Sequence, residues 1–90
     1  MTLPTIHTGG TSASSLLADN KAAFTAINAA IKALSAAAPN GRDYYLTPGG
    51  TEAAVEEHRA RLDKLLAVRK DLEELCRYLY REGMRRETAA

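Results

Sequence analysis

The sequence predicts an all-α fold: an antiparallel two-helix hairpin with an extended N-terminal arm, assembling into a homo-oligomeric helical bundle. Apolar residues recur every three or four positions along two long segments, and a stretch rich in proline and glycine separates those segments. The chain has only 90 residues, and a chain of this size buries only about two thirds of its unfolded surface. We therefore expect residues 1–90 to form a single small helical domain that needs partner subunits for stability.

Residues 1–12 are expected to form the arm, because one proline and two glycines oppose helix formation there. The first helix is predicted over residues 13–38. Hydroxyl side chains at its start can cap the free amides, and Pro39-Asn40-Gly41 stops it. Its apolar seam consists of Leu17, Phe24, Ile27, Ile31 and Leu34, with Asn20 filling the gap in the stripe.

The second helix is predicted over residues 52–85, followed by a tail at 86–90. Thr51 is the expected N-cap, and Glu52 complements the positive end of the helix dipole. The apolar seam of this helix consists of Val55, His58, Leu62, Leu65, Val68, Leu72, Leu75 and Leu79. Charged residues of alternating sign lie away from the seam as i,i+4 pairs, which is typical of a solvated helix surface.

The two predicted helices differ in length, so the end of the second overhangs the first. At a rise of about 1.5 Å per residue, the first is roughly 36 Å long and the second roughly 50 Å. The overhanging end carries Leu75, Leu79, Tyr80 and Met84, which need cover from the arm or from another subunit. The first helix also carries alanines off its seam, which admit a neighbouring backbone, although alanine is also simply the best helix former. Size and overhang together predict a homo-oligomer.

The loop at residues 39–51 is long for a connection between bundle helices, and ordered loops of this length are often functional. One interpretation is structural: Tyr44 and Tyr45 form a hydrophobic plug, with Arg42 and Asp43 paired beside them. The other uses the same atoms for a ligand. Tyrosine rings stack on planar bases, arginine donates a forked pair of hydrogen bonds to phosphate, and free amides at a helix start favour an anion. The ligand-binding residues predicted here are Arg42, Tyr44, Tyr45, Thr47, Gly49, Gly50 and Thr51.

The N-terminal stretch offers similar chemistry. Its glycines let the backbone approach a ligand closely, and its hydroxyls and free amides form a second candidate anion cradle. The residues predicted to take part are His7, Thr8, Gly9, Gly10, Thr11 and Ser12. A plain N-cap explains the same residues without a ligand. In a simple hairpin this stretch lies at the opposite end from the loop, so the two cradles meet only if another subunit brings them together, and the pockets would lie at subunit interfaces.

Several functional classes find little support in the composition. We expect no enzyme, no metal and no cofactor, because His7 and His58 lack metal-ligand spacing and Cys76 has the setting of an inert thiol. Twelve basic residues against eleven acidic ones give a net charge of +1, which argues against long nucleic acids and membranes as partners. Arg69, on the flank of the second seam, is either a snorkelling side chain or a phosphate contact in an oligomer. A single cysteine and the absence of a signal-peptide pattern predict a cytoplasmic protein.

The octet "APNGRDYY", residues 38–45, is followed by a Gly/Pro turn and a charged helix. In this it resembles a group of short phage and prophage proteins of unassigned function, and the resemblance covers most of the chain. In overall plan and size the chain is also similar to small helical phage sponge proteins, which sequester nucleotide immune signals. The similarity is in architecture and size only, and no site residue is carried over from those proteins.

The resemblance and the loop chemistry together lead to one functional expectation. The protein would be a phage-type, non-catalytic binding protein of the host cytoplasm that sequesters a small nucleotide-like anion in interface pockets, countering host immune signalling. The alternative is a structural or scaffold protein of a virion, or a protein that binds and inhibits a host partner, in which the tyrosine loop docks another protein.

Overall fold

The computed structural model describes the backbone of residues 1–89 and the side chains of residues 1–86. It contains three helices: α1 (Ala13–Ala36), α2 (Gly41–Tyr44) and α3 (Gly50–Ala89). No strand occurs between residues 1 and 89, so the predicted all-α class is confirmed. None of the described helices is long and apolar enough to cross a membrane.

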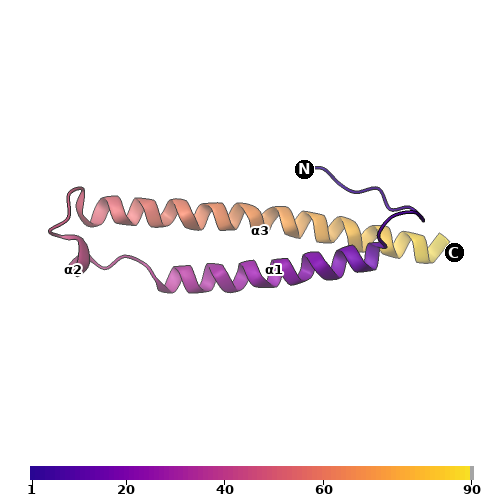
Figure 1. Ribbon diagram of the computed structural model, residues 1–90, viewed down its shortest axis with the longest axis horizontal. Coiled ribbons are helices and arrows are strands. Elements are labelled where there is room, and N and C mark those ends of the chain that lie inside the picture. Colours follow the sequence, from indigo (N-terminus) through magenta and orange to yellow (C-terminus); the bar gives the residue numbers. More distant parts are fainter. Residues whose placement is uncertain (90) are drawn as a thin grey trace.

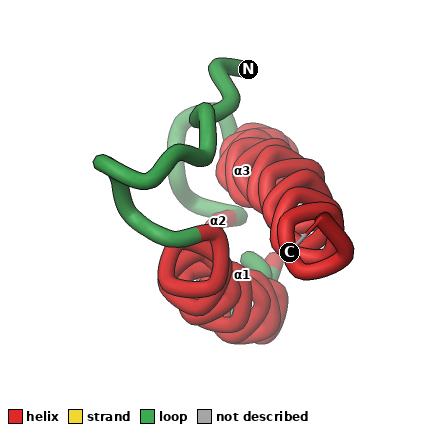
Figure 2. The backbone as a smooth tube through the Cα atoms, turned by 90° about the vertical axis from the view of Figure 1, so that its right-hand side faces the viewer, coloured by secondary structure: helices red, strands yellow, loops and turns green. Residues whose placement is uncertain are grey.

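The two long helices lie side by side and run in opposite directions (Figure 1). The molecule measures 65 × 20 × 18 Å. Seen end-on, α1 and α3 form two adjacent columns, and the N-terminal arm passes over one side of the pair (Figure 2). The connection that contains α2 lies at one end of the rod, and the arm lies at the other (Figure 1).

Helix α1 begins where the hydroxyls predicted. The side chain of Ser12 accepts a hydrogen bond from the amide of Ser15 at 3.1 Å, which makes Ser12 the N-cap. The helix ends at Ala36, two residues before the predicted end at 38. Proline disfavours helical geometry in the residue that precedes it, so Pro39 restricts Ala38 and ends the helix early.

The connection and the limits of α3 differ from the sequence-based expectation. The predicted loop contains a helical turn, α2, whose N-cap Asn40 accepts a hydrogen bond from the amide of Arg42 at 2.9 Å. Helix α3 starts at Gly50, so Thr51 lies inside its first turn and the prediction of Thr51 as the N-cap is wrong. The helix also continues through Ala89, beyond the predicted end at 85, because the last residues are good helix formers with no breaker among them. The last residue of the predicted tail, Ala90, lies outside the described residues.

The residues of α3 that face α1 differ in part from the predicted seam. His58 and Leu79 are buried, whereas Val55 and Val68 are 37% and 44% exposed. Ala54 is buried in place of Val55, and Arg69 is half-buried where Val68 was expected. The predicted spacing averaged fewer residues per turn than an α-helix has, so the predicted face drifted away from the real one.

The N-terminal arm covers the overhanging end of α3. Ile6 from the arm, Ala13 from α1 and Leu79 from α3 form a small buried cluster. Two hydrogen bonds hold the arm there: Tyr78 Oη donates to the carbonyl of Pro4 at 2.7 Å, and the Arg86 guanidinium donates to the carbonyl of Ile6. The arm therefore supplies within one chain part of the cover that the overhang needs.

Candidate functional site

The tip of the molecule carries the predicted loop residues on a chain of tight turns. The amide of Tyr45 donates to the carbonyl of Gly41 at 3.1 Å, and the amide of Thr47 donates to the carbonyl of Tyr44 at 3.0 Å. The amide of Gly50 then donates to the carbonyl of Thr47 at 2.8 Å. These bonds fold the loop into an ordered cap at the start of α3.

Two glycines make the entry into α3 feasible. Gly49 and Gly50 have φ angles of +85° and +67°, in the left-handed region that other residues adopt only at a cost. A Cβ atom on Gly49 would also lie 3.1 Å from the Cβ of Ala53, whereas one on Gly50 would meet nothing within 4 Å. The glycines are thus needed for the backbone turn itself, and close approach of a ligand is not required to explain them.

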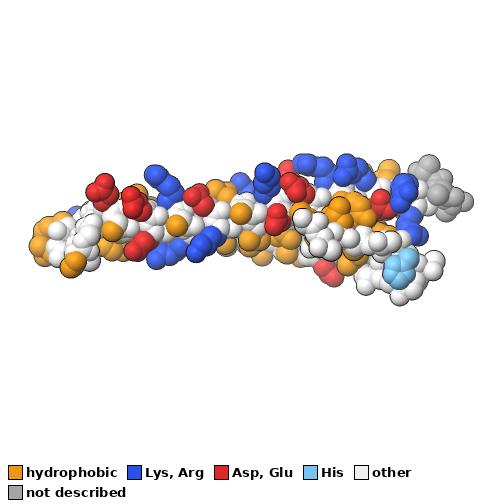
Figure 3. Space-filling model, turned by 90° about the horizontal axis from the view of Figure 1, so that it is seen from above, with side chains coloured by type: hydrophobic (Ala, Val, Ile, Leu, Met, Phe, Trp, Pro, Cys, Tyr) orange, Lys and Arg blue, Asp and Glu red, His pale blue; other side chains and the backbone are white. Residues whose placement is uncertain are grey.

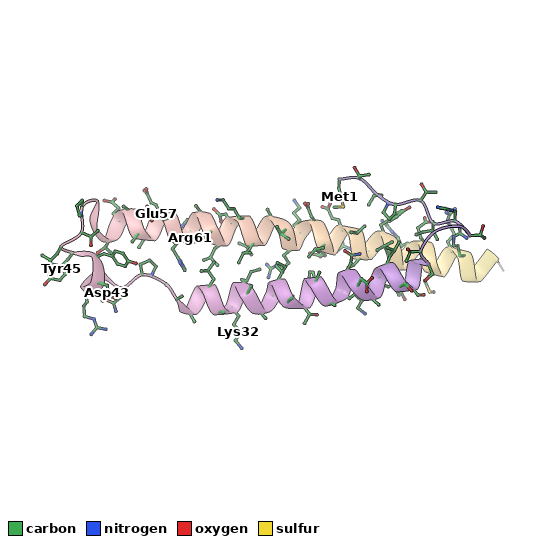
Figure 4. The ribbon with its side chains drawn as sticks, in the orientation of Figure 1. Met1, Lys32, Asp43, Tyr45, Glu57 and Arg61 are labelled. Carbon is green, nitrogen blue, oxygen red and sulfur yellow. The ribbon has the colours of Figure 1, made fainter. Side chains whose placement is uncertain are left out.

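The two adjacent tyrosines have different environments. Tyr44 is half-buried, as a plug would be, but Tyr45 is 72% exposed and its neighbour Leu46 is 82% exposed. The ring of Tyr45 projects from the end of the rod, away from both long helices (Figure 4). Arg42 is exposed, and among the described side chains no acidic group pairs with its guanidinium, so the expected Arg42–Asp43 pair is not formed. The tip therefore offers an aromatic face and a cationic group to a partner.

The N-terminal stretch forms a turn and a helix cap. The amide of Gly10 donates to the carbonyl of His7 at 3.1 Å, and Ser12 caps α1. The side chain that approaches Gly10 closely belongs to the chain itself: a Cβ atom on Gly10 would lie 2.9 Å from Nε2 of His7. Thr8, Gly9 and Thr11 are exposed. The N-cap interpretation thus accounts for Ser12, and the His7 ring accounts for Gly10.

The structure does not bring the two predicted cradles together. Arg42, Tyr44, Tyr45, Thr47, Gly49, Gly50 and Thr51 lie at the tip, and His7, Thr8, Gly9, Gly10, Thr11 and Ser12 lie at the other end of the rod (Figure 1). Within one chain they are two separate surfaces.

A groove that the sequence analysis did not single out runs between α1 and α3 near the arm end. Its wider part has a volume of about 370 Å³ and is lined by Leu17, Lys21, Phe24, Glu73, Cys76, Arg77 and Tyr80. A second hollow of about 180 Å³ is lined by Ala13, Ser14, Leu17, Leu79, Tyr80, Gly83 and Met84. Leu17 and Tyr80 line both, so the two hollows are adjacent. None of the predicted ligand-binding residues lines either hollow. One indication of this groove was present in the sequence: Tyr80 and Met84, which line it, were named in the sequence analysis as apolar residues that need cover.

The groove has an apolar floor and a charged rim. Arg77 on the rim pairs with Glu73 at 2.6 Å, and both side chains are more than half exposed, so the pair adds little stability. Beyond the groove, Arg85 donates a hydrogen bond to Glu82 at 2.6 Å, and this bond together with the negative charge of Glu82 raises the pKa of Arg85. The Arg85 guanidinium therefore stays cationic.

Metal ligands, Cys76, His58 and Arg69 were also considered in the sequence analysis. No cluster of three or more His, Cys, Asp or Glu residues that could hold a metal exists in the described part of the chain. Cys76 is a half-buried free thiol on the groove wall. His58 is buried, and its Nε2 atom has no hydrogen-bond partner. Arg69, one of whose predicted roles was a phosphate contact, donates a hydrogen bond to Asn28 on α1.

Comparison with protein-family models, with curated proteins and with solved structures finds no match to this chain.

Proposed function

We propose that this chain is a non-catalytic binding protein that acts as a homo-oligomer, with a helical hairpin as the repeating unit. The observation that supports it best is the excess of exposed surface. The chain exposes 6695 Å², whereas a compact monomer of its mass would expose about 5,100 Å². The difference, about 1,600 Å² per chain, is roughly twice the ~800 Å² that each partner buries in a standard protein–protein interface.

The shape and the burial pattern support the same proposal. The radius of gyration is 19.2 Å, against about 12 Å for a compact domain of this length. The largest seam residues of α1 are only half-buried, and Leu79 is the single side chain among the described residues with no exposed surface. A two-helix unit covers each seam on one side only, and packing against further helices completes the core.

The oligomer is tested by measuring its mass and the concentration dependence of its stability. Light scattering coupled to size exclusion should give a mass of at least two chains, and the midpoint of thermal unfolding should rise with protein concentration, because folding and assembly are linked. A monomeric mass across the micromolar range, with a midpoint independent of concentration, would overturn the proposal.

The proposed ligand is a small nucleotide-like anion, sequestered in the cytoplasm of a host cell to counter immune signalling. The support is chemical: the exposed Tyr45 ring can stack on a base, and the Arg42 guanidinium can hold phosphate. In the first turn of α3, the amides of Thr51 and Glu52 have no backbone partner among the described residues. The resemblance in plan to phage sponge proteins adds to it. Cyclic and linear nucleotides are therefore the probes to use.

The ligand is tested by native mass spectrometry with a panel of those nucleotides. Arg42→Ala and Tyr45→Ala should each weaken adduct formation at least tenfold. Lys32→Ala is the matched control, because Lys32 is an exposed cation on α1 whose side chain projects from the side of the rod and not from the tip (Figure 4). Unchanged binding in both tip variants, with helicity retained in circular dichroism, would remove the tip from the site.

The second candidate function is that of a scaffold or protein-binding component of a virion or of a host-inhibitory complex. The exposure of Leu46 beside Tyr45 favours it, because an aliphatic side chain contributes to a protein interface but not to holding an anion. An oligomer that binds no nucleotide in the panel would favour this candidate, especially if Leu46→Ala abolishes capture of a defined virion or host protein.

A further inference from the structure

Most of the exposed large apolar side chains of α3 form one stripe along the helix; Val68, which is 44% exposed, lies about 200° around the helix from Leu66 and is not part of it. Val55, Leu66, Tyr80 and Met84 are each between 37% and 58% exposed. They are separated by 11, 14 and 4 residues, which are close to whole numbers of turns at about 3.6 residues per turn. All four therefore lie on the same side of α3. This stripe runs along one edge of the seam that faces α1, because the seam residues Leu62 and Arg69 lie close to whole turns from Leu66 and Tyr80.

The stripe lies on the groove side of the molecule, opposite the arm. Tyr80 and Met84 line the groove, together with Leu17 of α1. Tyr78, which binds the arm through its hydroxyl, is two residues from Tyr80 and hence about 200° around the helix from it. The end-on view likewise shows the arm on one side of the pair of helices (Figure 2). The arm thus covers one side of the pair, and the apolar residues on the groove side are left uncovered.

The charges at the two ends of α3 are opposite. Its first turns carry Glu52, Glu56 and Glu57 without any basic residue, a net charge of −3. Its turns from residue 77 to 86 carry four arginines and one glutamate, a net charge of +3. Figure 3 shows acidic side chains gathered toward the tip end and basic ones toward the arm end. Two α3 helices packed antiparallel would pair these ends, and a parallel pair would set like charges against each other.

We propose that the groove side is a two-fold interface on which a second copy of this chain packs with its α3 antiparallel, giving a four-helix bundle. The inference rests on the proposed homo-oligomer and names its interface. The apolar stripe, the groove and the end charges all favour a second copy of this chain, and the excess exposed surface of each chain exceeds the area that one partner buries in a standard dimer. Matching the acidic and basic ends places the two-fold axis near residues 67 and 68 of α3.

This arrangement also brings the two surfaces that lie apart in one chain to the same end of the dimer. The tip of each copy comes to the level of the other copy's arm end, where α1 starts and the four arginines of residues 77–86 gather. Arg42 and Tyr45 of one copy would then lie level with the N-terminal stretch of the other, which is on the side away from the interface. Each end of the dimer would thus combine one exposed tip with a cluster of cations, which favours a ligand with several negative charges.

Cross-linking tests the geometry with the chain's single cysteine. Near the axis, the two copies of residue 66 lie within about 6 Å along the helix direction, while the two copies of Cys76 lie about 25 Å apart. A short bismaleimide should therefore link Leu66→Cys in a Cys76→Ser background and should leave the native protein unlinked. Lys64→Cys in the same background is the control, because Lys64 is exposed and lies on the opposite side of α3.

The outcomes separate the interface from the oligomer. An oligomer in which native Cys76 cross-links efficiently has parallel helices, and one in which Lys64→Cys links but Leu66→Cys does not uses another face; either result overturns the proposed interface and leaves the oligomer standing. A monomeric wild-type mass overturns both. As a second measurement, Leu66→Glu and Tyr80→Glu should each raise the dimer dissociation constant at least tenfold, while Lys64→Glu leaves it within threefold. Helicity in circular dichroism checks that the variants stay folded.

Discussion

Arg69 on α3 donates a hydrogen bond from Nη1 to Oδ1 of Asn28 on α1, at 3.2 Å, about midway along the two helices. Both side chains are half-buried. A polar pair inside an apolar seam contributes less to stability than to register, because sliding one helix along the other would leave both groups without partners.

Replacing Asn28 with alanine should lower the free energy of unfolding by about 1–2 kcal/mol, because the half-buried Arg69 guanidinium loses a charge-assisted hydrogen bond. Replacing both residues with leucine should restore that stability and broaden the distribution of oligomer masses. Chemical denaturation at one fixed protein concentration and native mass spectrometry measure the two effects. If the double variant instead forms one oligomer of a single mass, the Arg69–Asn28 pair does not set the register of the helices.

Tyr78→Phe should loosen the arm. The hydroxyl of Tyr78 donates to the Pro4 carbonyl at 2.7 Å, and losing a neutral hydrogen bond of this kind costs about 0.5–1.5 kcal/mol. Tyr80→Phe, two residues away on the groove side, is the control and should change stability less. Hydrogen exchange of the Ile6 amide region should rise in the first variant alone; equal exchange in both would mean that this bond does not hold the arm.

Gly49→Ala should destabilise the protein more than Gly50→Ala. Both substitutions place an L-residue at positive φ, which costs about 1–2 kcal/mol. At Gly49 the new methyl group would also lie 3.1 Å from the Cβ of Ala53, whereas at Gly50 it meets open space. Thermal unfolding of the two variants, followed by circular dichroism, gives the order; the reverse order would contradict this geometry of the turn.

Ser12→Ala should cost about 1 kcal/mol of stability, as expected for the loss of an N-cap. Thr11→Ala removes the adjacent hydroxyl, which caps nothing, and should change stability by less than half as much. If Ser12 instead served mainly as a ligand contact, its replacement would leave the unfolding midpoint of the ligand-free protein unchanged.

Local features of the sequence were sufficient to predict the helical class and the start of α1. The repeat of apolar residues and the hydroxyls before Ala13 act within a few residues of each other, so they can be recognised without tertiary information. The limits of α3 and the exact seam were missed. Arg69 could not be assigned to the seam from hydropathy, because its place there depends on an acceptor, Asn28, that lies 41 residues away in the sequence.

For the candidate site too, some features could be predicted from the sequence and others depended on the tertiary structure. Composition alone identified the tip and the N-terminal stretch as chemically distinctive, since tyrosine, arginine and paired glycines are uncommon in a plain helical connection. The roles of these residues depend on three-dimensional packing. Gly10 leaves room for the His7 ring, Ser12 caps α1, and Tyr45 is exposed. The groove between α1 and α3 is encoded by no short motif. A groove is a relation between side chains some 60 residues apart in sequence, and it exists only once the two helices have settled into register.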